Sequence, residues 1–278
     1  MQESNPPGER QNGMTDVELD DVEERASPRA RIIYEIVRRQ GDEELDRPPG
    51  SLFWSGIAGG ITIMMSVIAQ AALAHKLPAD MPGRQPVAEL GYSLGFVMVI
   101  LGRMQLFTEQ TIVTVLPIMA APGWRKLGIA VRLWIVVFVA NMAGSCTAAA
   151  LNTYFHLVSP ELLASMLEVS GPLLHKAPLE LLLQAIPAGF LVASIAWIRA
   201  GTAGGELWIV VLLTYAIALG GFAHVVAGSA EAFLLLFAGQ IGVGHALGGI
   251  IGTALVGNVI GGTGLFALLA HAQVRQEM

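Results

Sequence analysis

The sequence predicts an all-α integral membrane protein whose membrane segments include two that are interrupted near their middle. Hydrophobic residues make up 54% of the 278 residues and charged residues only 14%, whereas about 25% of the residues of a soluble domain are charged. Glycine is abundant, with 32 residues, as is typical where membrane helices approach one another closely. Two of the apolar runs contain polar residues at a depth where a spanning helix should be continuous.

Six membrane segments are expected after residue 50. They cover residues 51–74, 90–121, 127–155, 178–199, 207–238 and 246–270. The second segment is interrupted by Arg103 to Gln110, and the fifth by Gly220 to Ser229, which includes His224. Backbone groups freed by such a break are tolerated in a membrane only when they are buried in protein or line a cavity. Two interrupted segments at corresponding positions are typical of transport proteins.

The position of the two breaks predicts an inverted repeat. The breaks lie three segments apart, so the halves 51–155 and 178–270 should cross the membrane in opposite directions. The two breaks would then meet near the middle of the membrane. This expectation depends on hydropathy, because residue identity between the halves is weak.

The N-terminal 50 residues differ from the rest of the chain. They carry the whole net charge of −6, and the remainder is neutral. We expect residues 1–27 to be a disordered acidic cytoplasmic tail, because they contain almost no large apolar side chains. No basic face suggests a nucleic-acid partner. Residues 51–270 would form the pore domain, and 271–278 a cytoplasmic C-terminal tail.

Residues 28–50 are expected to form an amphipathic helix and a linker. The apolar face of the helix would consist of Ile32, Ile33, Ile36 and Val37, and Gly41 would end it. Such a helix either lies on the lipid interface or docks on the protein surface. The Lys and Arg residues near the membrane segments favour a cytoplasmic location for both chain ends. The residues of this side are Arg25, Arg29, Arg31, Arg38, Arg39, Arg47, Arg125, Lys126, Arg132, Arg199 and Arg275, against Lys76, Arg84 and Lys176 on the other.

Three motifs carry a resemblance to a known family. They are Leu106-Phe107-Thr108, Gly221-Phe222-x-His224 and Gly257-Asn258-x-Ile260-Gly261-Gly262. In this order and topology, residues 50–270 resemble the formate/nitrite transporter family, and the acidic extension looks most like its YfdC-type branch. The resemblance implies an aquaporin-like fold assembled as a homopentamer in the bacterial inner membrane, with one pore per protomer. It implies passage of small monovalent anions such as formate or nitrite, in several cases with a proton, and no cofactor or metal.

The resemblance also implies roles for individual residues. His224 matches the central histidine, Thr108 the threonine that hydrogen-bonds to it, and Asn258 a pore-lining asparagine. Leu106 and Phe107 match residues of the apolar constriction. His175 and Lys176 are approximate counterparts of a family lysine at the entrance. The chain departs from the family where acidic or amide residues are usual, at Ala223, Gly228 and Gly189.

His224 beside Thr108 would allow a weak acid to cross the membrane. Removing water from an anion is costly, whereas histidine changes its charge near neutral pH and can exchange a proton. We expect the hydroxyl of Thr108 to orient one ring nitrogen and to leave the other facing the pore. The alternatives are that His224 only satisfies the broken backbone, that Thr108 caps the loop, and that Asn258 joins two helices.

Three charged residues lie near the breaks. Arg103 and Glu109 are expected to pair across the first break, or else to form a site for an unusual substrate. Glu231 would act similarly near the second break, paired with Arg103.

Other classes of function are weighed against an anion pore. A neutral-solute channel of the aquaporin type would carry Asn-Pro-Ala at each break, and neither break does. An intramembrane hydrolase would need a nucleophile beside His224, and the chain lacks a Gly-x-Ser-x-Gly elbow. A pore-like scaffold that acts as a sensor stays open, because several polar positions of the family are small residues here.

Overall fold

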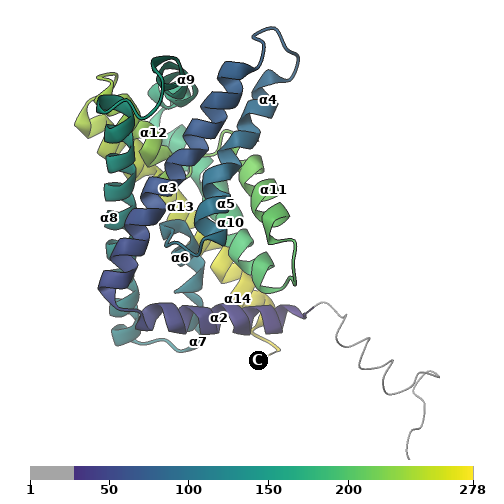
Figure 1. Cartoon of the computed structure of the whole chain (residues 1–278). Coiled ribbons are helices and arrows are strands. Elements are labelled where there is room, and N and C mark those ends of the chain that lie inside the picture. The colour runs from purple at the N-terminus through teal and green to yellow at the C-terminus, as the bar shows by residue number, and fades with distance from the viewer. Residues whose placement is uncertain (1–27, 278) are drawn as a thin grey trace, which may run out of the picture.

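The computed structural model describes residues 28–277, which form a bundle of helices with one helix lying across its end (Figure 1). The elements are α2 (Ala30–Asp46), α3 (Pro49–Lys76), α4 (Arg84–Glu89), η2 (Leu90–Tyr92), α5 (Ser93–Leu101), α6 (Phe107–Val113), α7 (Leu116–Ala120), α8 (Trp124–Tyr154), α9 (Pro160–Ser170), η3 (Gly171–Leu174), α10 (Pro178–Ala200), α11 (Glu206–Leu219), α12 (Val225–Phe237), η4 (His245–Gly252), α13 (Thr253–Val259), η5 (Ile260–Ala267) and α14 (Leu268–Val274).

Four helices are long and apolar enough to cross a membrane within the described residues: α3, α8, α10 and the continuous run His245–Val274. With 28 residues, α3 is about 42 Å long at the rise of an α-helix, enough for the roughly 30 Å of a bilayer core. These helices correspond to the expected first, third, fourth and sixth segments. The remaining two segments are divided into the shorter helices α5, α6 and α7, and α11 and α12.

The same type of turn interrupts both divided segments. Residues 102–106 separate α5 from α6, and residues 220–224 separate α11 from α12. In each turn one residue has a left-handed backbone, Arg103 with φ 54° and Gly221 with φ 59°. The next N–H in each turn donates to a carbonyl five residues back, an arrangement known as a Schellman motif. These bonds run from Met104 to Val99 (2.9 Å) and from Phe222 to Ile217 (3.0 Å).

The crossings of the long helices also correspond between the two halves. Gly60 of α3 lies against the backbone of Asn141 in α8, and Gly189 of α10 against the backbone of Asn258 in α13. A side chain at either glycine would overlap the facing backbone. Gly189, where the family usually has an asparagine, therefore lies at a helix crossing that has no room for a side chain. In Figure 1, α3 runs from the α2 end towards α4, whereas α10 returns from the α9 end, as an inverted repeat requires.

Helix α2 is longer than expected and docks on the protein. It does not end at Gly41 but continues to Asp46, because a glycine at this position lets the helix pass against the carbonyl of Val113 and the ring of Pro117. The buried face is not that of the isoleucines: it comprises Tyr34, Val37, Gly41 and Leu45. The hydroxyl of Tyr34 lies 2.7 Å from Nδ1 of His271 in α14.

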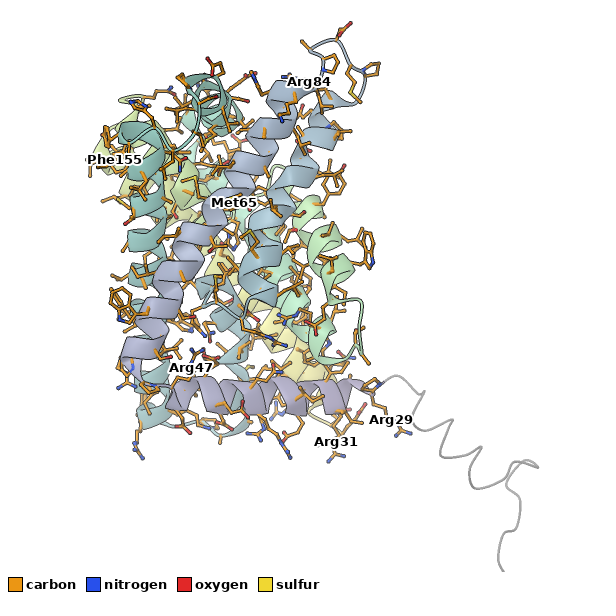
Figure 2. The ribbon with its side chains drawn as sticks, in the orientation of Figure 1. Arg29, Arg31, Arg47, Met65, Arg84 and Phe155 are labelled. Atoms are coloured by element: carbon orange, nitrogen blue, oxygen red, sulfur yellow. The ribbon has the colours of Figure 1, made fainter. Side chains whose placement is uncertain are left out.

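The two ends of the bundle differ in their charges. Figure 2 shows Arg29, Arg31 and Arg47 at the end where α2 lies, and Arg84 at the opposite end. The short helices α4 and α9, which hydropathy did not predict, lie at this opposite end (Figure 1). They surround the mouth of the cavity described below.

Candidate functional site

The two broken segments bring His224 and Thr108 together inside the bundle. His224 immediately precedes α12, and Thr108 lies in the first turn of α6. Nε2 of His224 is 2.7 Å from Oγ1 of Thr108, and the residues are only 1% and 0% exposed. The ring of Phe96 lies edge-on to the imidazole, with the ring centres 4.9 Å apart. The contact is therefore a buried polar pair surrounded by apolar groups.

The second ring nitrogen of His224 does not face a pore, which corrects the expectation from sequence. Nδ1 accepts a hydrogen bond of 3.2 Å from the N–H of Ala227 and caps the first turn of α12. An acceptor at Nδ1 places the hydrogen of the neutral ring on Nε2. Nε2–H then donates to Thr108 Oγ1, so both nitrogens of His224 bond within the protein.

Two buried asparagines hold the breaks in corresponding ways. Oδ1 of Asn141 accepts from the N–H of Phe107 (2.9 Å), and its Nδ2 donates to Gln105 O (2.9 Å) and Gly56 O (2.8 Å). Oδ1 of Asn258 accepts from the N–H of Val225 (2.8 Å), and its Nδ2 donates to Ala223 O (2.9 Å) and Ala185 O (2.8 Å). Each amide satisfies two backbone groups of its break and joins them to a carbonyl of α3 or α10.

Asn258 is therefore placed as a link between helices, the alternative to the pore-lining position that the resemblance implies. Its side chain is fully buried and does not line the cavity. Asn141 was not singled out from the sequence. The signal was present, because an amide in the middle of an apolar membrane segment requires a partner.

Leu106 and Phe107 lie at the start of α6 and are almost completely buried. The ring of Phe107 packs edge-on against Trp134 and Phe138 of α8, at centroid distances of 5.7 and 5.3 Å. Leu106 occupies the position before α6 that His224 occupies before α12. Both residues directly precede Thr108 in the sequence, and neither lines the cavity described below.

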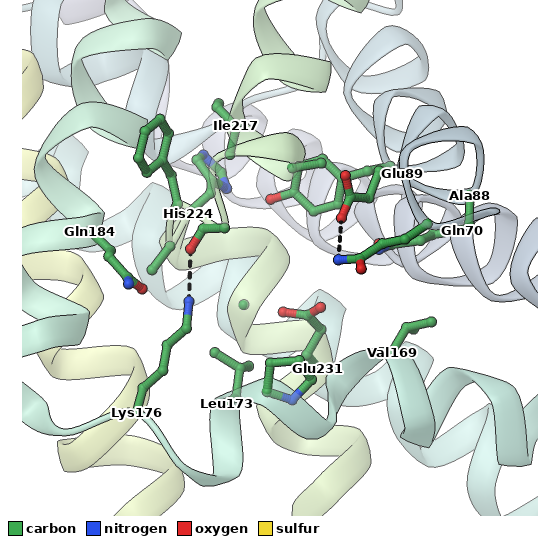
Figure 3. Close-up of a pocket in the computed structure, with 18 of the residues that line it drawn as sticks. Gln70, Ala88, Glu89, Val169, Leu173, Lys176, Gln184, Ile217, His224 and Glu231 are labelled. Carbon is green, nitrogen blue, oxygen red and sulfur yellow. Dashed lines mark hydrogen bonds between the residues drawn. The ribbon is translucent and has the colours of Figure 1, made fainter. Parts of the chain in front are cut away.

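A cavity of about 500 Å³ leads from the α4 and α9 end of the bundle to His224 (Figure 3). We call this cavity the vestibule. Ala223 and Gly228 form part of its wall, where the family usually has polar side chains. Its charged lining comprises Arg84, Glu89, Glu168, Lys176 and Glu231.

Lys176 is the cation nearest to the broken segment. Its ammonium donates to the carbonyl of Gly221 at 2.7 Å (Figure 3). Burial lowers the pKa of Lys176, while the negative charges of Glu231 and Glu180 act in the opposite direction. His175, the other expected entrance residue, is exposed and does not line the vestibule.

The expected ion pairs of Arg103 are not formed. Glu109 instead pairs with Arg199 of α10, at 3.4 Å between Oε1 and Nη1, and Nε of Arg199 is 3.0 Å from Oε2 of Glu206. The early restart of α6 at Phe107 directs Glu109 towards α10, while Arg103 is exposed at the turn. Glu231 lines the vestibule and makes no ion pair with Arg103.

Two half-length broken helices that meet at a buried polar pair below a vestibule define a membrane transporter or channel. The chain belongs to the formate/nitrite transporter family, whose profile, described as Formate/nitrite transporter, matches residues 31–272. The resemblance found in the motifs is thereby confirmed. The family comprises transporters and channels, so the hydrolase alternative is excluded.

Two curated relatives extend this match over nearly the whole chain. The inner membrane protein YfdC of Escherichia coli is 35% identical over 262 residues, which cover 94% of this chain and 84% of the relative. The uncharacterized transporter YrhG of Bacillus subtilis is 26% identical over 264 residues, which cover 86% of this chain and 92% of the relative.

Solved structures share the fold at low sequence identity. A pentameric formate channel with formate bound has a TM-score of 0.70 at 20% identity, covering 82% of this chain and 98% of its own. A channel described as an FNT family ion channel has a TM-score of 0.72 at 18% identity, covering 88% and 98%. The all-α membrane fold predicted from the sequence is confirmed.

Proposed function

We propose that the protein is a channel or transporter for small monovalent anions of weak acids, of the size of formate or nitrite. Each protomer would contain one pore, and the chain would assemble as a homopentamer in the bacterial inner membrane. The pentameric formate channel of the same fold supports this assembly. The arginines at the α2 end support a cytoplasmic location for that end and for both chain termini. The vestibule would then open on the opposite side.

The observation that carries the proposal is the path from the vestibule to the His224–Thr108 pair. Lys176 in the vestibule wall would provide a positive charge close to the second break, where it could attract an anion. Behind His224, which lines the vestibule, the hydrogen of the buried Thr108 hydroxyl has no acceptor among the described residues once Nε2–H donates to Oγ1. It can donate to an anion in transit. Phe107, which matches a residue of the family's apolar constriction and packs on the aromatic rings of α8, would form the apolar barrier beyond this pair.

The proposal is tested by flux into liposomes that contain the purified protein. We expect uptake of formate or nitrite above that of protein-free liposomes, at two pH values, in a panel with hydrosulfide, acetate and chloride. Thr108→Val should lower the flux at least tenfold, because it removes the hydroxyl and preserves the side-chain shape.

Thr147→Val is the matched control, since Thr147 is exposed on α8 and, among residues 28–277, its hydroxyl bonds only to Ala143 O. It should leave the flux unchanged. Uptake of glycerol without uptake of any anion would favour a neutral-solute channel. A protein that takes up no member of the panel would favour the sensor scaffold.

The assembly and the orientation have separate tests. Native mass spectrometry of the detergent-solubilised protein should give a mass of five chains, and a monomer or trimer would contradict the proposed pentamer. A fluorescent reporter fused to either chain end should fluoresce in the bacterial cytoplasm. A reporter active only in the periplasm would reverse the orientation.

A further inference from the structure

Glu231 faces the vestibule from the same side of α12 as the residues at its inner end. His224, Gly228 and Glu231 are spaced by four and then three residues, which places them on one face of a helix. All three line the vestibule. Gly228 has no side chain, and an added Cβ would meet no atom within 4 Å. Open space therefore extends for about 10 Å along the helix from Glu231 to the histidine.

The carboxylate of Glu231 has no partner within residues 28–277. It makes no hydrogen bond there, and Lys176 directs its ammonium to Gly221 O instead (Figure 3). Two other carboxylates of the bundle are paired, since Glu89 accepts from Gln85 Nε2 at 2.9 Å and Glu109 pairs with Arg199, whereas Glu168 at the mouth is exposed. A carboxylate without donors that points into a cavity is available to a guest molecule.

Charged and titratable groups from every neighbouring element face this carboxylate across the vestibule. Lys176 approaches from the segment before α10, Tyr92 from η2 and Glu168 from the mouth at α9. Arg84 and Glu89 belong to α4, and the guanidinium of Arg84 is held by the carbonyl of Ala74. None of them provides Glu231 with a hydrogen bond. The protonated carboxyl group is neutral, so it can approach an anion without charge repulsion and can donate a hydrogen bond to it.

We propose that Glu231 donates a proton to the weak-acid anion in the vestibule, before the acid reaches the His224–Thr108 pair. This inference rests on the proposed function. The O–H bond of the Glu231 carboxyl group breaks, and a new O–H bond forms on an oxygen of the anion, so that a neutral acid moves inward. Glu231 then recovers its proton from a hydronium ion in the vestibule. No oxidation or reduction is involved.

His224 is poorly placed for this step, because both of its ring nitrogens bond within the protein. A proton added at Nδ1 would face the N–H of Ala227 and open the first turn of α12. The transfer is therefore assigned to Glu231, and the histidine keeps the helix closed.

The test compares Glu231→Gln and Glu231→Met with the wild-type protein in liposomes that contain a pH-sensitive dye. In the wild type, formate uptake should acidify the lumen by one proton per anion and rise towards acidic pH. Both variants should lose at least tenfold of the protein-dependent formate flux, and the remaining flux should not depend on pH. Glu231→Asp should retain the pH dependence.

Glu161→Gln is the matched control, because Glu161 is an exposed carboxylate of α9 outside the vestibule lining. It should behave as the wild type. If Glu231 were only a fixed negative charge, both variants would raise formate flux and keep its pH dependence, which would overturn the inference and leave the proposed function intact. A wild-type protein without any anion flux would overturn both.

Discussion

The two breaks have the same backbone conformation but different side chains. Each has a turn of residues 102–106 or 220–224, one left-handed residue, and a buried asparagine that binds the backbone where the second half-helix begins. The position before the second half-helix, however, is Leu106 in one break and His224 in the other. The repeat thus provides the scaffold twice, whereas the polar chemistry depends on residues that the halves do not share.

The vestibule follows the same asymmetry. Both halves contribute to its lining, including Arg84 and Glu89 of α4, but of the two breaks only the second lines it, through Gly221 to His224. At the first break, Glu109 instead pairs with Arg199 of α10. The side chains of the first break therefore make contacts within the protein, whereas those of the second break line a cavity.

The largest effect is expected from removing the asparagines. Asn141→Leu and Asn258→Leu each leave two buried backbone groups of the break without partners, at a cost of about 1–3 kcal/mol for each group. Both variants should unfold at much lower denaturant concentration than the wild type in detergent. Asn152→Leu is the matched control, because the Asn152 amide bonds only within its own helix.

Equal losses of stability in Asn141→Leu and Asn258→Leu would show that the two halves depend equally on these asparagines. A loss confined to one variant would mean that the two breaks have the same geometry but that only one asparagine contributes to the stability of the protein.

A smaller effect, opposite in the two halves, is expected at the left-handed residues. Gly221→Ala should destabilise the protein by about 1 kcal/mol, because an L side chain is strained at positive φ, while the nearest atom, Lys176 Nζ, leaves it room. Arg103→Gly should stabilise the protein by less than about 1 kcal/mol, since glycine removes the strain but adds freedom to the unfolded chain.

Thermal unfolding of both variants in the same detergent measures this difference. If Arg103→Gly destabilised the protein instead, a stabilising contact of the exposed Arg103 side chain would outweigh the strain of its left-handed backbone.

The smallest effect concerns α2, which has no counterpart in the second half. Hydrogen bonds from Arg38 and then Arg39 lower the pKa of Glu35 from 4.5 to about 2. Because the folded-state pKa lies below the unfolded value, Glu35 stabilises α2 above about pH 4.5, and this contribution is lost as the pH falls towards 2. Its side chain is largely exposed, so the effect is modest.

Hydrogen exchange of α2 amides should therefore accelerate between pH 4.5 and 2 relative to the pore helices, after correction for the intrinsic pH dependence. Glu35→Gln should abolish the pH-dependent part. An unchanged profile in this variant would assign the effect to another carboxylate.

Much of the fold could be predicted from the sequence because hydropathy in a membrane is a strong signal. The six segments and both breaks followed from where apolar runs must be continuous. The end of α2 was predicted wrongly because Gly41 usually ends a helix but here sits at a crossing, a role that only the facing Val113 and Pro117 reveal. Helix α9 was missed because it lies outside the apolar pattern.

The site was less predictable. Motifs placed His224 and Thr108 together, but the cap on Nδ1 depends on where α12 starts, which hydropathy does not give to one residue. The partner of Glu109 depended on how α6 and α10 face each other, so nearness in sequence wrongly favoured Arg103. Asn141 could have been found by treating it as Asn258 was treated.

The hydrogen bonds of Asn141 and Asn258 to the breaks have a consequence for the order in which the chain folds during synthesis. Asn141 reaches its break across 34 and 36 residues, and Asn258 across 33 and 35, whereas His224 and Thr108 are 116 residues apart. Short separations close sooner than long ones, and domains emerging during synthesis fold from the N-terminus. The first half can therefore seal its own break while the ribosome is still making the second, and the polar pair forms only when the halves dock.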